Sequence, residues 1–182
     1  MMRGLRYSGI TGVLTYWLFV AWSIRENPWF SFTKNALSDL GSPEKASAPP
    51  WIYNYGLIIT SLFVLAFSVC LVLSAENKLQ TVGGAYVSVS SLFLALIGGV
   101  FHAGTRPPHT FVSTYFFVQF FLGGMLLYGG VASRDRAIRY GSVALFALAV
   151  LGTPVSWPSA ALIETYEIAL IAIFTMLVAV KH

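Results

Sequence analysis

Long apolar runs separated by polar links occupy most of this chain. Six of them reach, or nearly reach, the length of about 20 residues with which a helix crosses the hydrocarbon core of a bilayer. The pattern predicts an all-α integral membrane protein, a six-transmembrane-helix bundle formed as a single domain by residues 1–182. The runs lie at Tyr7–Ile24, Trp51–Leu73, Leu79–Phe101, Phe111–Val131, Tyr140–Thr153 and Ser156–Val180.

The first and fifth runs need arguments of their own. The first follows Arg3 and Arg6 as a signal peptide would, but bulky Trp22 and charged Arg25 stand where a small-residue cleavage site belongs, so we expect a retained helix. The fifth is short, and it gains length if it begins near residue 137 with the charge of Arg139 reaching back to the interface.

The composition agrees with a membrane protein. Hydrophobic residues make up 57% of the chain and charged residues only 10%, whereas soluble domains carry about a quarter charged residues. The mean hydropathy is +0.73. The net charge of +4 comes mostly from basic residues that flank apolar runs, so we expect no nucleic-acid binding. Cys70 is the only cysteine, and the chain can form no internal disulfide.

The distribution of basic residues predicts the orientation. Cytoplasmic segments of membrane proteins carry an excess of Lys and Arg. With a cytoplasmic N-terminus, the inner and outer sets favour N- and C-termini that are both cytoplasmic, in the cell membrane. The inner set is Arg3, Arg6, Lys78, Arg134, Arg136, Arg139 and Lys181, and the outer set is Arg25, Lys34, Lys45 and Arg106.

The outer link from Arg25 to Pro50 is far longer than the usual connection between helices. Within it, the segment Phe30–Gly41 has a capped, amphipathic pattern that predicts a short helix. We expect its part Asn35–Leu40 to pack against the outer ends of the bundle.

Polar residues from three distant segments fall on this outer side. Two of them, Glu164 and Glu167, lie inside the last apolar run, in the outer third of the membrane, where a carboxylate is costly unless it is paired, protonated or facing a polar cavity. The candidate ligand-binding residues are Asn35, Ser38, Asp39, His102, Arg106, His109, Glu164 and Glu167.

Three sequence segments resemble a known family. They are Asn35-Ala-Leu-Ser-Asp-Leu-Gly41, Asn54-Tyr-Gly-Leu-Ile-Ile59 and the stretch from Ala95 to Thr110, which carries two histidines in and after a turn. Together they resemble the six-helix membrane family catalogued as domain of unknown function 998. The resemblance implies the fold and a membrane location, and it supplies neither an activity nor catalytic residues.

Several functions fit these residues. The first is an outward-opening polar cavity that binds or processes a membrane lipid or other amphipathic ligand, with Arg106 holding an anionic head group. The second is a metal-dependent hydrolase that uses His102, His109 and the acidic residues, although the His-x6-His spacing matches no standard zinc motif, and we assign no metal site. The third is a proton-coupled transporter, with Glu167 titrating.

A purely structural role is a further alternative. Asp39 can cap its own segment. The two glutamates can form ion pairs with Arg106, Lys34 or Arg25 that hold the outer loops on the bundle. The sequence alone leaves the enzyme question, any cofactor, any catalytic residue and the oligomeric state open.

Overall fold

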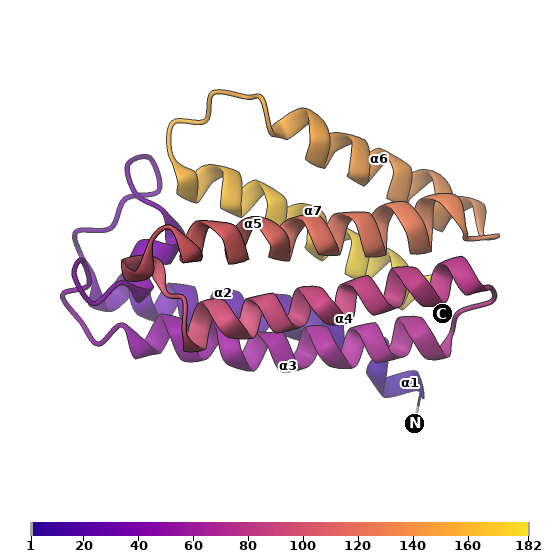
Figure 1. Cartoon of the computed structure of the whole chain (residues 1–182), viewed down its shortest axis with the longest axis horizontal. Coiled ribbons are helices and arrows are strands. Elements are labelled where there is room, and N and C mark those ends of the chain that lie inside the picture. Colours follow the sequence, from indigo (N-terminus) through magenta and orange to yellow (C-terminus); the bar gives the residue numbers. More distant parts are fainter. Residues whose placement is uncertain (1, 182) are drawn as a thin grey trace.

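The structure is a computed structural model that describes the backbone of residues 2–181 and the side chains of residues 4–181. It is all-helical, with no strand in this range (Figure 1). η1 and η2 are 3-10 helices and η3 is a π-helix that continues α5. The elements are α1 Met2–Leu5, α2 Ser8–Glu26, η1 Leu37–Gly41, α3 Trp51–Leu73, α4 Lys78–Gly99, η2 Ala103–Thr105, α5 Pro108–Phe120, η3 Phe121–Val131, α6 Arg136–Gly152 and α7 Ala160–Lys181.

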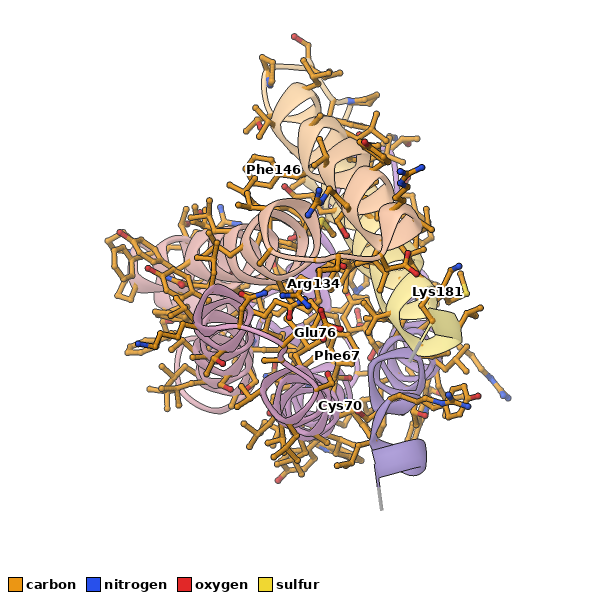
Figure 2. All side chains as sticks on the ribbon, turned by 90° about the vertical axis from the view of Figure 1, so that its right-hand side faces the viewer. Phe67, Cys70, Glu76, Arg134, Phe146 and Lys181 are labelled. Atoms are coloured by element: carbon orange, nitrogen blue, oxygen red, sulfur yellow. The ribbon has the colours of Figure 1, made fainter. Side chains whose placement is uncertain are left out.

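The long helices lie side by side in one bundle (Figure 1). The end-on view in Figure 2 places α6 on the outside, where it packs on η3 and α7. α1 and the end of α7 lie at one end of the bundle, and residues 27–50 and η2 lie at the other (Figure 1). We call this second end the long-loop end.

Within the described residues, four helices are long and apolar enough to cross a membrane: α3, α4, the continuous helix Pro108–Val131 and α7. The chain is therefore a helical membrane protein, as its hydropathy predicts. Each of the six predicted apolar runs contains a helix, although α4 ends at Gly99, before the predicted Phe101, and α7 begins at Ala160, after the predicted Ser156. α6 has only 17 residues, and the 19 residues of α2 include several Ser, Thr and Tyr positions, so neither is among the four.

α6 begins earlier than the predicted start at Tyr140. Asp135 precedes the helix, and its Oδ1 accepts hydrogen bonds from the backbone N–H groups of Ala137 at 2.8 Å and Ile138 at 3.0 Å. This cap satisfies N–H groups that have no partner within the helix. The helix therefore starts at Arg136, within the basic segment.

The segment Phe30–Gly41 does not form the helix that we predicted along its whole length. Residues 32–34 form a turn, and only Leu37–Gly41 is helical, as the 3-10 helix η1. Short polar side chains bind the backbone here: Oδ1 of Asn35 accepts from the N–H of Ser31 at 2.8 Å, and Oδ2 of Asp39 accepts from the N–H of Ala36 at 3.0 Å. Such bonds compete with regular α-helix formation.

Glycine allows close backbone approach at two places that shape the bundle. A Cβ on Gly41 would overlap the side chain of Asn54 and lie 2.8 Å from Cδ1 of Tyr53, so η1 rests directly on the start of α3. A Cβ on Gly83 would lie 2.6 Å from the carbonyl oxygen of Gly123, where α4 meets the π-helix η3. Small residues at helix contacts are typical of membrane bundles.

The end of the bundle opposite the long loop holds surface charge pairs and a buried apolar core. Nε of Arg134 lies 4.0 Å from Oε2 of Glu76, and both residues face the viewer in Figure 2. Lys181 lies 3.9 Å from Asp135. Phe67 is fully buried, and its ring centroid lies 6.2 Å from that of Phe174.

Candidate functional site

η1 is the centre of the long-loop end. It contacts α2, α3, α7 and η2, so residues far apart in the sequence meet around it. The backbone N–H of Leu37 donates to Oε2 of Glu164 at 2.7 Å. Asn35, which precedes η1, adds a second link: its carbonyl oxygen accepts a hydrogen bond from the N–H of Ala161 at 2.9 Å. These bonds fix the long loop to the first turns of α7.

A central cavity lies beneath η1. It contains about 750 Å³ of empty space, including its open part, and it is lined by residues of α2, η1, α3, α4, α5 and α7. Most of its wall is apolar. The apolar side chains are Val13, Leu57, Val64, Phe67, Leu94, Ile97, Phe116, Phe117, Phe120, Ile168 and Ile171.

The polar lining is concentrated near the long-loop end. Ser38 belongs to η1, while Tyr53, His109 and Glu164 lie in the first turns of α3, α5 and α7, which all begin at that end. The hydroxyl oxygens of Tyr53 and Tyr16 are 3.4 Å apart. The cavity thus has a polar end and a body that is apolar except for the hydroxyl groups of Thr60 and Thr175.

His109 is held in one tautomer by a backbone contact. Its Nδ1 lies 2.7 Å from the carbonyl oxygen of Phe101. Since a carbonyl can only accept, Nδ1 carries the proton, and in the neutral ring Nε2 is left as an acceptor. That atom lies 3.5 Å from Oγ of Ser113, a second hydroxyl that lines the cavity. His109 therefore presents an acceptor near the polar end.

Apart from His109, Glu164 is the only acidic or basic side chain of residues 4–181 that lines the cavity. One carboxylate oxygen accepts the bond from Leu37, and a carboxylate has two oxygens with about four acceptor positions. In the described part of the chain, neither Glu164 nor Glu167 forms an ion pair with Arg106, Lys34 or Arg25. The loop partner of Glu164 is thus the backbone amide of Leu37, where the sequence had suggested an ion pair with Arg106, Lys34 or Arg25.

Glu167 follows three residues later but does not line the cavity. Three residues correspond to a turn of about 300° on an α-helix, so the two side chains point about 60° apart. Glu167 is half-buried, and its side chain forms no hydrogen bond or ion pair within residues 4–181. The two glutamates therefore differ in surroundings, although the sequence grouped them.

A second, shallower hollow lies at the same end and is separate from the cavity. Its lining includes Asp39, Glu44, Lys45 and Arg106. Nζ of Lys45 lies 2.8 Å from Oδ1 of Asp39, and the Asp39 side chain is buried while that of Lys45 is half exposed. Arg106 is exposed. Two acidic and two basic groups balance one another here.

The structure divides the eight candidate residues among three places. Ser38, His109 and Glu164 line the central cavity. Asp39 and Arg106 line the shallow hollow. Asn35, His102 and Glu167 line neither, and the side chains of the first two bind backbone N–H groups of their own loops, those of Ser31 and Gly104.

The sequence did not single out five polar residues of the cavity: Tyr16, Tyr53, Thr60, Ser113 and Thr175. Each lies inside an apolar run, where one hydroxyl side chain changes the hydropathy pattern very little. The signal that could have found them is their position on buried helix faces. Thr60 is the clearest case, because its Oγ1 is buried and has no hydrogen-bond partner among the described residues.

No three His, Cys, Asp or Glu side chains within residues 4–181 lie close enough to hold a metal ion together. The hydrolase hypothesis required His102, His109 and an acidic residue to converge. In the structure His109 lines the cavity and His102 does not. The geometry therefore offers no support for that hypothesis.

Comparison with known proteins gives one result. No similar protein was found among curated proteins, and no similar chain among solved structures. A family model described as "Protein of unknown function (DUF998)" matches residues 10–181, which is nearly the whole chain and covers every residue of the cavity except Gly9. The chain therefore belongs to the membrane protein family that its Ser-Asp-Leu-Gly segment and its histidine-containing turn had indicated.

Proposed function

We propose that this protein binds a membrane lipid or another amphipathic molecule in the central cavity. The apolar part of the molecule lies along the body of the cavity, and its polar head lies at the long-loop end near Ser38, His109 and Glu164. One observation carries the proposal. Among the described residues, one acidic side chain, that of Glu164, faces an otherwise mostly apolar cavity inside a bundle of membrane-type helices.

The apolar wall supports the position of the tail. Each buried CH₂ group contributes about 0.8 kcal/mol when it leaves water, but a lipid tail gains little by moving from the bilayer into an equally apolar cavity. Affinity over bulk lipid must therefore come mainly from the polar end. The hydroxyls of Tyr16 and Tyr53, His109 and Glu164 supply hydrogen-bonding groups there.

We also propose that α2 and α6 cross the membrane beside the four longer or more apolar helices, which gives six spans. Both run along the bundle in Figure 1. With the basic residues counted as above, both ends of the chain are then cytoplasmic and the long-loop end is extracytoplasmic. The polar end of the cavity would open toward the outer leaflet.

Arg106 has no part in this cavity. It lines the shallow hollow together with Asp39, Glu44 and Lys45. An anionic head group held by Arg106 would therefore sit outside the central cavity, and the proposed ligand does not depend on it.

A cavity-filling variant tests the proposal. The protein is placed in phosphatidylcholine nanodiscs, and binding of three radiolabelled twelve-carbon amphiphiles, with ammonium, hydroxyl and carboxylate heads, is measured with empty nanodiscs subtracted. Ile168→Trp fills the cavity, and Leu94→Phe is a milder second variant. Leu62→Trp is the matched control, because Leu62 is 62% exposed on the outside of α3.

We expect saturable binding of at least one amphiphile by the wild type and by Leu62→Trp. We expect at least tenfold weaker binding by Ile168→Trp or, if that variant does not fold, a clear weakening by Leu94→Phe. Failure of all three amphiphiles to bind saturably, or equal binding by the folded cavity variants, would contradict the proposal.

A further inference from the structure

The charge of the cavity indicates what kind of head group it accepts. No lysine or arginine is among the lining residues of the described chain, and the carboxyl group of Glu164 is the one acidic group that faces the space. A phosphate or carboxylate head would meet no positive side chain there, and it would be repelled by an ionised glutamate. Burying an unpaired anion is costly.

The hydrogen-bonding groups point the same way. Oε2 of Glu164 accepts from Leu37, and its second oxygen is an acceptor with no other acidic or basic side chain bonded to it within residues 4–181. Nε2 of His109 is an acceptor because Nδ1 donates to Phe101. The hydroxyls of Tyr16, Tyr53 and Ser38 can both donate and accept. Acceptors therefore outnumber obligate donors at the polar end of the cavity.

Aromatic side chains add a further preference. Tyr16 and Tyr53 line the polar end, and their ring centroids are 6.3 Å apart. Aromatic faces attract cations, by about 0.5–1 kcal/mol at exposed sites and about 2 kcal/mol when water is excluded. A carboxylate beside two tyrosines thus combines both kinds of group that recognise an organic ammonium.

We propose that the ligand of this cavity is an amphipathic cation, a molecule with a protonated amine or other ammonium head and an apolar tail. This inference rests on the proposed function, because it assigns the charge of the molecule that occupies the same cavity. The ammonium pairs with the free oxygen of Glu164 and donates to His109 or to the tyrosine hydroxyls. The tail extends toward the apolar side chains of α5 and α7.

Competition in the wild-type protein tests the inference without a variant. Radiolabelled dodecylammonium is bound to the protein in phosphatidylcholine nanodiscs at neutral pH and is displaced by unlabelled dodecylammonium, 1-dodecanol or dodecanoate. We expect dodecylammonium to compete at least tenfold better than 1-dodecanol, and dodecanoate to compete least. Equal or better competition by the alcohol or the carboxylate would overturn the assignment of a cation.

Two variants locate the charge. Glu164→Gln keeps an oxygen that can accept from Leu37 while it removes the negative charge, so the fold is disturbed little. Glu167→Gln removes a carboxylate from the same helix outside the cavity, and it is the matched control. We expect Glu164→Gln to weaken dodecylammonium binding at least tenfold more than it weakens 1-dodecanol binding, and Glu167→Gln to change neither by more than twofold.

The outcomes distinguish the assignment of a cationic head group from the more general proposal that the cavity binds an amphiphile. Binding of the alcohol or the carboxylate in preference to the ammonium, or unchanged ammonium binding by Glu164→Gln, would overturn the cation and leave amphipathic binding intact. Saturable binding of none of the three would overturn the proposed function and the cation with it.

Discussion

The backbone N–H of Leu37 and the carboxylate of Glu164 are joined by a hydrogen bond of 2.7 Å between segments 127 residues apart in the sequence. Leu37 is completely buried, so its N–H depends on a protein group as its acceptor. The same side chain faces the central cavity. Glu164 thus ties the long loop to α7 and also contributes the charge at the polar end of the cavity.

Removal of this acceptor should destabilise the protein. Glu164→Ala leaves the buried N–H of Leu37 without a partner, which costs about 1–3 kcal/mol. Glu164→Gln retains an acceptor and should cost less. Thermal unfolding in one detergent compares both variants with Glu167→Ala, whose side chain has no hydrogen bond in the described chain. Equal losses for Glu164→Ala and Glu167→Ala would show that the Leu37 bond adds no stability.

Asp39 should matter more to stability than its ion-pair partner Lys45. Lys45 is half exposed, and exposed pairs contribute about 0–1 kcal/mol, so Lys45→Ala should have a small effect. Asp39→Ala also removes the acceptor of the Ala36 N–H within a buried segment, at a cost of about 1–3 kcal/mol. Unfolding of the two variants under identical conditions measures the difference. A larger loss for Lys45→Ala would mean that the ion pair dominates.

Gly41 should not tolerate a methyl group. Gly41→Ala places Cβ against the side chain of Asn54 and 2.8 Å from the ring of Tyr53, and such overpacking costs about 1–3 kcal/mol. Gly99→Ala is the control, because its Cβ would meet only one side-chain atom, at 4.0 Å. The readout is the midpoint of thermal unfolding. A midpoint for Gly41→Ala within one degree of that for Gly99→Ala would contradict the close contact between η1 and α3.

Cysteine accessibility in intact cells tests the orientation. Cys70 is buried and is replaced by serine to give a background without reactive thiols. In the proposed topology Ala46→Cys lies outside and reacts with a membrane-impermeant maleimide, whereas Ala132→Cys lies inside and reacts only after the cells are opened. The reverse labelling pattern would show that the long-loop end is cytoplasmic, and labelling of both positions would rule out their lying on opposite sides.

The helices could be predicted from the sequence because the length of an apolar run is enough to identify a membrane helix. The boundaries were less certain where a polar side chain decides them, as Asp135 does for α6 and Asn35 and Asp39 do for the long loop. These residues are ordinary caps, but in the sequence they look like parts of charged or polar links.

For the site, the sequence could predict only the end of the bundle at which the polar residues lie. Topology placed Ser38, His109 and Glu164 at one end, but it could not show which side chains face inward. Glu164 and Glu167 illustrate the limit, because a difference of about 60° around the helix separates a cavity-lining residue from one that does not line it. Tyr16 and Tyr53 lie in apolar runs, and the sequence of those runs does not indicate that their hydroxyl groups face a cavity.

The binding of an amphiphile in the central cavity is tested most directly by mapping which residues its tail contacts. A twelve-carbon amine with a photoactivatable diazirine near the end of its tail is cross-linked to the wild-type protein in nanodiscs, with and without excess unlabelled dodecylammonium, and the labelled peptides are identified by mass spectrometry. We expect saturable labelling of the residues of α5 and α7 that line the apolar body of the cavity, which are Phe116, Phe117, Phe120, Ile168 and Ile171. Labelling that excess ligand does not reduce, or that falls only on outward-facing residues such as Leu62 and Leu151, would contradict binding in the cavity.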